Sequence, residues 1–368
     1  MRPNSPQSTT VTPINHSNQL DGLRFFAVSV IMLGHWYQWT WTNPVYAKLP
    51  LVHGVDLFYV LSGFLITRIL LNNRNYAPQI SPSALLKTFY VRRFLRIFPI
   101  YYLLIFGLFA FNYANTRELF PWLVTYTSNL YQSFNNVSVG EFNHFWSLAV
   151  EEQFYLFWPL LMLLLPKRNI PWVLGITLVL ALLSRAYFHF FVHKWMATSF
   201  FTLNCMHLFS LGGILAYFQL NKPNWFKNLS QSYWFFLAFV TYSLLFYGIE
   251  TYHWDWFKVI FDEFLFGIVA FFAIAVAARN GFKYVSAFIL EHPWVLHVGK
   301  ISYGMYIIHL FIPSFYYWLF PKLGISLSNK FTEFVFLYLL TFGLAHLSWT
   351  YLESPINRLK SRFSYAVH

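Results

Sequence analysis

About ten apolar runs follow one another along the chain, and each is long enough to cross a bilayer as a helix. The runs lie near 23–41, 51–71, 97–113, 145–165, 172–190, 200–219, 232–249, 258–278, 298–320 and 331–352. This pattern predicts an all-α, polytopic membrane bundle of about ten transmembrane helices. It divides the chain into a polar tail at 1–19, a membrane domain at 20–355 and a basic tail at 356–368.

The positive charges alternate between the connections that join these runs. On one side of the predicted bundle, the connections and the C-terminal tail hold most of the Lys and Arg residues. The connections on the other side hold only Lys48, Arg117, Lys194, Lys258, Lys322 and Lys330. Because cytoplasmic loops of membrane proteins are enriched in Lys and Arg, both termini are predicted to be cytoplasmic.

Two connections are longer than the others. Residues 72–96 contain the basic amphipathic segment LLKTFYVRRFLRIFP, which is predicted to lie along the cytoplasmic interface. Residues 114–144, on the outer side, contain FPWLVTYTSNLYQSF, which is typical of either a re-entrant segment or an interfacial helix.

Composition agrees with a membrane protein and limits the possible chemistry. The 368 residues are 57% hydrophobic and 10% charged, whereas soluble domains carry about a quarter charged residues. The formal charge of +12 is explained by topology, so nucleic acid is not an expected partner. Cys205 is the only cysteine, which excludes a disulfide framework and a cysteine-based metal site. The oligomeric state is left open.

The first run carries two ionisable residues, Arg24 and His35. They are eleven residues apart, so they share a helix face and are separated by roughly 16 Å along the axis. Ionisable groups at membrane depth are costly and commonly functional. The alternative is an interfacial arginine together with a hydrogen-bonded packing histidine.

The second run opens with HGVDLFYVLSGFLI, in which Asp56 lies just inside the predicted outer end. A carboxylate at this depth needs a partner. Because the first two helices are antiparallel neighbours, we expect Asp56 to approach His35 and to orient its imidazole. The alternatives are a helix cap and an ion pair with an outer Lys. Ser62 and Gly63 indicate close helix packing.

An arginine cluster precedes the third run, at Arg92, Arg93 and Arg96. Arg92 and Arg96 are one turn apart and share a helix face. Guanidinium pairs suit phosphate groups, through forked hydrogen bonds and through charge. Taken alone, the cluster is also typical of lipid headgroup binding.

The fourth run begins HFWSLAVEEQFYLFWPL and carries two adjacent carboxylates, Glu151 and Glu152. Adjacent helical residues point about 100° apart, so both cannot face one cavity equally. We interpret the pair as functional, with the residue that faces the cavity left open. His144 and Trp146 flank the start of this helix.

The ninth run contains ISYGMYIIHLF, where Ser302, Tyr303, Tyr306 and His309 form one polar stripe. By itself His309 is typical of a satisfied core histidine. Glu353, near the end of the last run, is expected to form an ion pair with a basic residue. The sequence has no phosphate-binding loop, nucleophile elbow or metal-ligand motif, so no metal is expected.

Six of these segments together resemble the acyltransferase 3 family, the integral-membrane O-acyltransferases of bacterial surface carbohydrates. The matching segments are LDGLRFFAV with Arg24 and His35 in an R-x10-H arrangement, GVDLFYVLSGFLI, FYVRRFLRIFP, FWSLAVEEQFY, ISYGMYIIH and ESPINR. They occur in family order and cover nearly the whole chain. Without a hydrolase-like extension, the chain is similar to the stand-alone members.

The resemblance implies a multi-pass enzyme of the bacterial cytoplasmic membrane. Its expected reaction moves an acyl group, most commonly acetyl, from cytoplasmic acyl-CoA to a saccharide hydroxyl on the outer side. Such O-acetylation modifies lipopolysaccharide, exopolysaccharide or other cell-envelope glycans. His35 matches the essential histidine of the family. The candidate donor-binding residues are Arg24, Arg92, Arg93 and Arg96.

The mechanism suggested by these residues uses His35 as general base, oriented by Asp56 or Glu151. The candidate substrate contacts are Glu152, Trp146 and Tyr155. The outer aromatic residues also suit stacking on sugars, although an interfacial aromatic belt explains at least half of them. These residues are Trp36, Trp39, Trp41, Tyr126 and Trp146. Direct transfer and an acyl-histidine relay both remain open.

Two other classes of function fit the same polar residues. A transporter or flippase for a lipid-linked saccharide would use the buried His and Glu as a proton relay. A receptor or scaffold with vestigial sites would tolerate replacement of His35.

Overall fold

The computed structural model describes residues 17–40, 53–76, 80–279, 281–324, 327, 329–363 and 365, with the side chains of 37–40 and 76 excepted. These residues form helices and turns, and no strand occurs among them. The longer helices of the first half are α1 (Asn18–Thr40), α2 (Gly54–Tyr76), α3 (Pro82–Ala110), α6 (Phe145–Leu164) and α7 (Ile170–Tyr187). Those of the second half are α9 (Thr202–Asn221), α11 (Ser232–Tyr252), α12 (Asp255–Arg279), α14 (Pro293–Ile308) and α16 (Lys330–Ser348). The shorter helices are α4 (Thr116–Val124), α5 (Ser128–Asn135), α8 (Trp195–Phe200), α10 (Pro223–Leu229), α13 (Tyr284–Leu290), α15 (Phe311–Leu319) and α17 (Ser354–Arg358).

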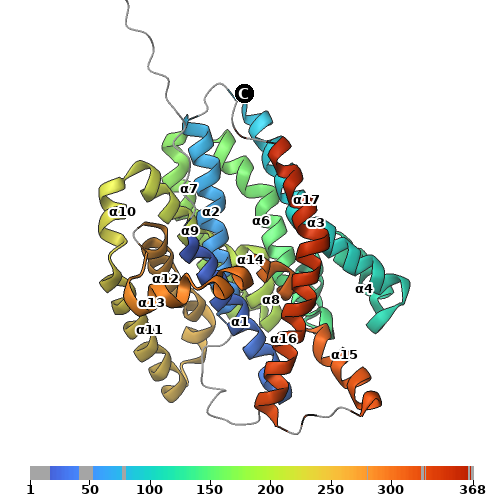
Figure 1. Cartoon of the computed structure of the whole chain (residues 1–368). Coiled ribbons are helices and arrows are strands. Elements are labelled where there is room, and N and C mark those ends of the chain that lie inside the picture. Colours follow the sequence, from blue (N-terminus) through green and yellow to red (C-terminus); the bar gives the residue numbers. More distant parts are fainter. Residues whose placement is uncertain are drawn as a thin grey trace, which may run out of the picture.

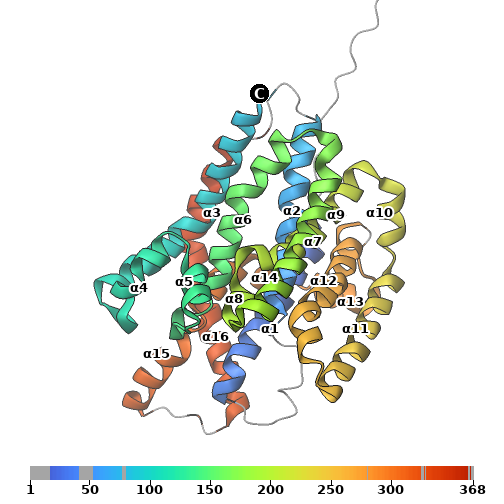
Figure 2. The same cartoon turned by 180° about the vertical axis from the view of Figure 1, so that it is seen from behind.

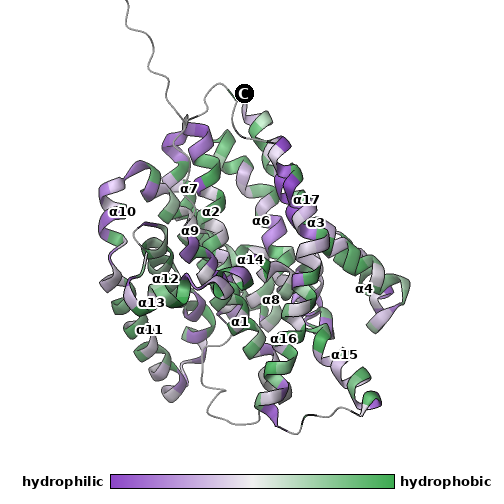
Figure 3. Cartoon of the chain, viewed as in Figure 1, coloured by the Kyte–Doolittle hydropathy of each residue, from purple (hydrophilic) through white to green (hydrophobic). Residues whose placement is uncertain are grey.

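The prediction of an all-α membrane bundle is confirmed, whereas the count of about ten spans is not. Each predicted run contains a helix, but seven helices of the described residues are long and apolar enough to cross a membrane. The number rises to eight if α14 and α15, which meet at a bend of 69°, count as one broken span. The helices α1 and α6 are not among the seven, since their polar residues lower the hydropathy. Apolar residues predominate along the helices in Figure 3, and hydrophilic ones gather at the end of α2.

Three helices occupy the middle of the bundle, α2, α6 and α9, with α1 and α14 beside them (Figures 1 and 2). The helices α10 to α13 lie on one side, and α3, α4, α15 and α16 lie on the other. Two clusters of buried apolar side chains hold these groups together, and α6 contributes to both. Phe154 belongs to the cluster with α2, α9 and α12, whereas Phe145 belongs to the cluster with α1, α3, α14 and α16.

The helices α2 and α9 cross in close contact at Gly63 and Gly212. A Cβ atom added to Gly63 would lie 2.2 Å from the carbonyl oxygen of Phe209. One added to Gly212 would lie 2.0 Å from the carbonyl oxygen of Val60. The predicted packing role is therefore confirmed for Gly63, because only glycine lets the two backbones approach this closely.

The long connection after α3 folds back into the bundle. The hydroxyls of Tyr101 and Tyr102 donate to the carbonyls of Leu123 and Val124, at 2.8 Å each, and so fix the end of α4 on α3. Two residues after Val124, the backbone carbonyl of Tyr126 accepts a hydrogen bond of 2.9 Å from Gln153 Nε2. Gln153 lies roughly 12 Å along α6 from its start. Tyr126, in the turn between α4 and α5, is therefore buried between α3 and α6.

We predict that Gly63→Ala will destabilise the protein by about 1–3 kcal/mol, because the added methyl group forces α2 and α9 apart. Thermal unfolding of the purified protein in detergent measures this effect. The matched control is Gly175→Ala in α7, where an added Cβ meets nothing within 4 Å. An equal effect of the two substitutions would contradict the packing role.

Candidate active site

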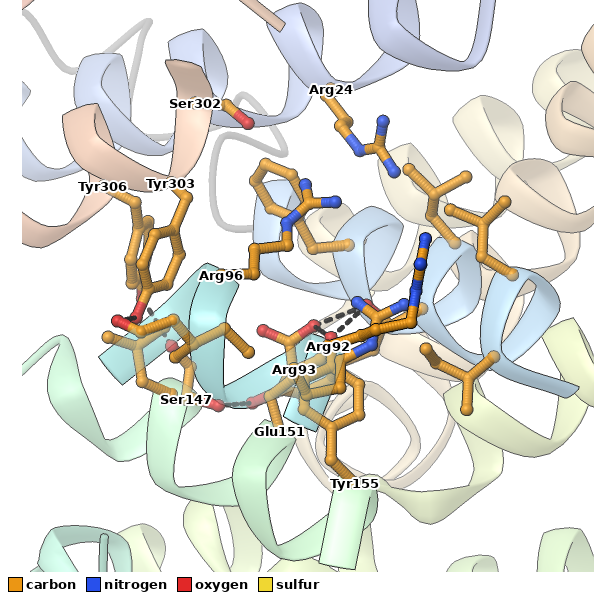
Figure 4. Close-up of a pocket in the computed structure, with 18 of the residues that line it drawn as sticks. Arg24, Arg92, Arg93, Arg96, Ser147, Glu151, Tyr155, Ser302, Tyr303 and Tyr306 are labelled. Atoms are coloured by element: carbon orange, nitrogen blue, oxygen red, sulfur yellow. Dashed lines mark hydrogen bonds between the residues drawn. The ribbon is translucent and has the colours of Figure 1, made fainter. Parts of the chain in front are cut away.

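A pocket of about 420 Å³, here called the first pocket, lies between α1, α2, α3, α6 and α14. Arg24 from α1 lines it together with Arg92, Arg93 and Arg96 from α3. Figure 4 shows these side chains around the cavity, with Glu151 and Tyr155 of α6 below them and Tyr303 and Tyr306 of α14 to one side. The sequence therefore identified residues that the fold brings together from distant parts of the chain.

The first pocket has a strong excess of positive charge. Arg24 is paired with Asp21, and Arg93 lies over the rings of Phe89 and Tyr155, at 5.6 and 5.3 Å from their centroids. The described residues provide no hydrogen bond or ion pair to the Arg96 guanidinium. Guanidinium groups clustered around a cavity with low-dielectric walls concentrate the field and attract polyanions.

The C-terminal segment covers part of the first pocket, which sequence reasoning missed. Lys360 and Tyr365 line the cavity. Arg92 holds this segment by donating to the carbonyls of Lys360 and Phe363, at 2.9 and 2.8 Å. The basic character of the tail was the available signal, but it did not specify that the tail folds back onto α3.

The structure separates the two adjacent carboxylates of α6. Glu151 lines the first pocket and accepts hydrogen bonds from Ser62 Oγ and from Tyr155 Oη. Glu152 lines a second pocket on the other side of Arg93 and Tyr155, and those two residues line both cavities. The expected divergence of the adjacent side chains is confirmed, and Glu151 is the one that faces the arginines.

The polar stripe of α14 leads from the first pocket to His35. Ser302, Tyr303 and Tyr306 line the pocket. Three residues after Tyr306, at the C-cap of α14, the buried His309 places its Nε2 2.7 Å from Nδ1 of His35. His309 is thus a satisfied buried histidine, as predicted, but its partner is the residue at the centre of the proposed chemistry. His35 itself lines neither pocket.

The hydrogen bonds determine which nitrogen of His35 is available. His309 Nδ1 lies 2.6 Å from the carbonyl of Tyr306, which can only accept, so Nδ1 carries the proton. A neutral His309 then accepts at Nε2 from the Nδ1–H of His35. This tautomer leaves the lone pair of His35 on Nε2, and the His309 contact fixes the orientation of the ring.

The expected contact between Asp56 and His35 is wrong. Asp56 Oδ2 instead binds His53 Nδ1 at 2.5 Å, and His53 Nε2 faces Asp262 Oδ2 at 3.3 Å. Tyr242 completes this buried network by donating to Asp262 at 3.1 Å. Asp56 binds His53 rather than His35 because His53 is only one helical turn before it in the sequence. This contact directs the Asp56 carboxylate towards α11 and α12. The orienting partner of His35 is His309.

Two further expectations about placement are corrected. Trp146, predicted as a substrate contact, lines neither pocket and stacks on Phe200 with ring centroids 4.2 Å apart. Glu353 accepts a hydrogen bond of 3.1 Å from Ser348 and forms no ion pair with the described residues. The side chains of Trp39 and Trp41, considered for sugar stacking, lie outside the described residues.

The part of the chain that the structure describes contains no group of three or more His, Cys, Asp or Glu residues that could hold a metal. The first pocket is lined by guanidinium, carboxylate, hydroxyl and phenol groups, and the imidazoles of His35 and His309 lie outside it.

We predict that His53→Ala will destabilise the protein by about 3 kcal/mol, because it leaves two buried carboxylates without their common partner. Thermal unfolding measures the loss. Addition of Asp56→Asn and Asp262→Asn to the same variant is expected to restore part of it. If the triple variant is no more stable than His53→Ala, the network is not held together by charge.

Comparisons with known proteins show which family the chain resembles. The sequence profile described as an acyltransferase domain, that of acyltransferase 3, matches residues 17–350. The O-acetyltransferase OatA of Staphylococcus aureus (strain NCTC 8325 / PS 47) is 27% identical over 92% of this chain and 57% of its own length. The peptidoglycan O-acetyltransferase OatA of Listeria monocytogenes serovar 1/2a is 36% identical over 45% of this chain and 27% of its own length.

The chain thus spans little more than half the length of the curated relatives that it matches most fully. No solved structure matches. The profile covers most of the chain, including α1, the arginine cluster of α3, the two glutamates of α6 and the α14 stripe. The chain therefore belongs to the acyltransferase 3 family.

Proposed function

We propose that this chain is a membrane O-acyltransferase that moves an acetyl group from acetyl-CoA to a saccharide hydroxyl of the cell envelope. The observation that carries the proposal is the arrangement of the α14 stripe, which joins an arginine-lined pocket to the His35–His309 pair. The names of the relatives support acetyl transfer, and that of the Listeria relative makes peptidoglycan the first acceptor to test.

The donor is proposed to bind with its phosphates in the first pocket. Coenzyme A carries a diphosphate and a further phosphate, and guanidinium groups bind such oxygens in pairs. Arg24 and Arg96 face the same cavity from α1 and α3, so one polyanion can contact both. From there the pantetheine arm would follow Tyr303 and Tyr306 towards His35. The excess of basic residues near this end of the bundle supports a cytoplasmic mouth, in the inner membrane of a bacterium.

His35 is proposed as the general base. Its Nε2 would take the proton of the acceptor hydroxyl as the oxygen attacks the thioester carbonyl. The tetrahedral intermediate then collapses, the carbon–sulfur bond breaks, and the imidazolium returns the proton to the thiolate. His309 supports both steps, because its Nε2 accepts from His35 Nδ1–H more strongly once His35 is charged. An acyl-histidine relay through the same Nε2 is the alternative route.

Glu151 is proposed to shape the first pocket and to balance part of its charge. Its carboxylate accepts from Ser62 and Tyr155 and faces the arginines, so it holds the α2 and α6 walls at a fixed separation. This role replaces the direct contact with His35 that the sequence suggested.

Replacement of the base should abolish most of the activity. We predict that His35→Ala lowers acetyl transfer from radiolabelled acetyl-CoA to envelope glycan by about 10²–10⁴-fold, the usual contribution of a general base. The assay compares membranes with matched protein levels. The control is His346→Ala, which removes one partner of the exposed pair His297–His346 on α14 and α16. Retained transfer by His35→Ala would contradict the mechanism, and donor-independent glycan translocation would instead favour a transporter.

The arginines of the first pocket should contribute to binding of the donor, acetyl-CoA, rather than to binding of the acceptor. We predict that Arg96→Ala raises the KM for acetyl-CoA by about 10–100-fold, the loss expected for one charge-assisted hydrogen bond. Steady-state kinetics with varied acetyl-CoA measure the change. Arg117→Ala is the matched control, because the Arg117 side chain binds Phe109 and Ala110 at the exposed end of α3, away from the first pocket. An unchanged KM for acetyl-CoA in Arg96→Ala would place the donor elsewhere.

A further inference from the structure

The chain returns to α3 after its last long helix, α16. It continues through a turn at Trp349–Glu353, the short helix α17 and a 3-10 turn at Leu359–Arg362. Both α17 and this 3-10 turn pack against α3 (Figure 1). The 3-10 turn, with Phe363 and Tyr365, is here called the C-terminal strap. Because Lys360 and Tyr365 line the first pocket, the strap supplies one wall of that cavity.

Arg92 of α3 holds the strap by its backbone. Nη1 of Arg92 donates to the carbonyls of Lys360 and Phe363, at 2.9 and 2.8 Å. The guanidinium carbon of Arg92 also lies 5.4 Å from the ring centroid of Tyr365. Since Nη1 carries two hydrogens, the two carbonyls use both of them. Hydrogen bonds from an ionised donor are among the stronger ones in proteins. Arg92 therefore fixes the position of the strap, and with it that of the Lys360 side chain.

Lys360 adds an ammonium group to a cavity that already holds four guanidinium groups. Three of these groups, those of Arg92, Arg93 and Arg96, act on the ammonium as like charges. Glu353 offsets part of this repulsion, but it forms no ion pair with Lys360 and does not line the pocket. Like charges that converge on a cavity repel one another, and a ligand of opposite charge between them reverses the sign of the interaction. The position of Lys360 therefore favours a polyanion that reaches the strap.

We propose that the C-terminal strap completes the donor pocket, with Lys360 binding a phosphate group of acyl-CoA and Arg92 acting as a positioning residue. This inference rests on the proposed function and extends it to the strap. A Lys ammonium binds phosphate as a compact point charge, whereas the forks of Arg24 and Arg96 suit paired oxygens. Arg92 contributes to donor affinity through the strap that it holds, because the two strap carbonyls use its Nη1 hydrogens.

Donor binding tests the role of Lys360 without any acyl transfer. The full chain in phosphatidylcholine nanodiscs is titrated calorimetrically with a non-transferable thioether analogue of acetyl-CoA. We expect Lys360→Ala to raise the Kd about tenfold, the value of one charge-assisted hydrogen bond. Arg362→Ala is the matched control and should leave the Kd unchanged, because Arg362 is an exposed basic residue of the same turn that lines neither pocket.

The titration distinguishes two kinds of failure. An analogue that does not bind the parent protein would overturn the proposed donor, and the role of Lys360 with it. Equal Kd values for the parent protein and Lys360→Ala would leave the donor in place and overturn only the role of Lys360.

A double substitution separates positioning by Arg92 from direct contact with the donor. If Arg92 acts through the strap, Arg92→Ala raises the Kd of the analogue, but the double variant Arg92→Ala/Lys360→Ala binds no more weakly than Lys360→Ala alone. Additive losses would mean that Arg92 binds the donor itself, and they would overturn its positioning role.

Cysteine labelling follows the strap independently of the donor. Cys205 is the only cysteine and is buried, so Lys360→Cys introduces an accessible thiol for N-ethylmaleimide. Arg92→Ala should speed labelling of this thiol about tenfold, because it removes the hydrogen bonds that hold the strap. An unchanged rate would overturn the anchoring role of Arg92.

The same thiol distinguishes a donor phosphate from the phosphate of a lipid headgroup. The thioether analogue should slow labelling of Lys360→Cys about tenfold at a concentration about ten times its Kd. Labelling of the control Arg362→Cys should be the same with and without the analogue. Protection of Lys360→Cys by phosphatidylglycerol in the nanodisc, but not by the analogue, would assign Lys360 to the membrane surface and overturn the proposal.

Discussion

The cost of holding charged groups inside an apolar bundle governs this structure. Four guanidinium groups and the Glu151 carboxylate converge on one cavity between α1, α2, α3, α6 and α14. Charges at membrane depth persist only where they have partners or face an aqueous or ligand-filled space. The fold meets this requirement with few internal ion pairs around the first pocket, and it leaves an excess of positive charge available to a polyanionic ligand.

A single helix, α14, connects the cavity with the proposed base, His35. Ser302, Tyr303 and Tyr306 line the first pocket, and His309 continues the same stripe to His35. Because His309 donates to a backbone carbonyl of its own helix, its tautomer is fixed by the fold. The tautomer of His35 follows from it in turn. One rigid element therefore sets both the path towards His35 and the protonation state of the proposed base.

The sequence predicted the helical class, the polar stripe, the arginine cluster and the divergence of Glu151 from Glu152, because each depends only on local helical periodicity. It failed where the outcome depends on which helices touch. Asp56 binds the nearby His53 instead of His35, and His53 in turn faces the distant Asp262. The packing of Trp146 on Phe200 and the folding of Lys360 over the pocket are likewise contacts between distant segments. The predicted number of spans was not confirmed, because α1 and α6 carry polar residues that lower their hydropathy.

The most direct test of the central claim is a cryo-electron microscopy structure of the full chain with a non-transferable thioether analogue of acetyl-CoA. The account predicts phosphate density against Arg24 and Arg96, and the acyl carbon within about 4 Å of His35 Nε2, close enough for an acceptor oxygen to reach both. Density for the nucleotide away from the first pocket, or an acyl end directed into the second pocket, would contradict it.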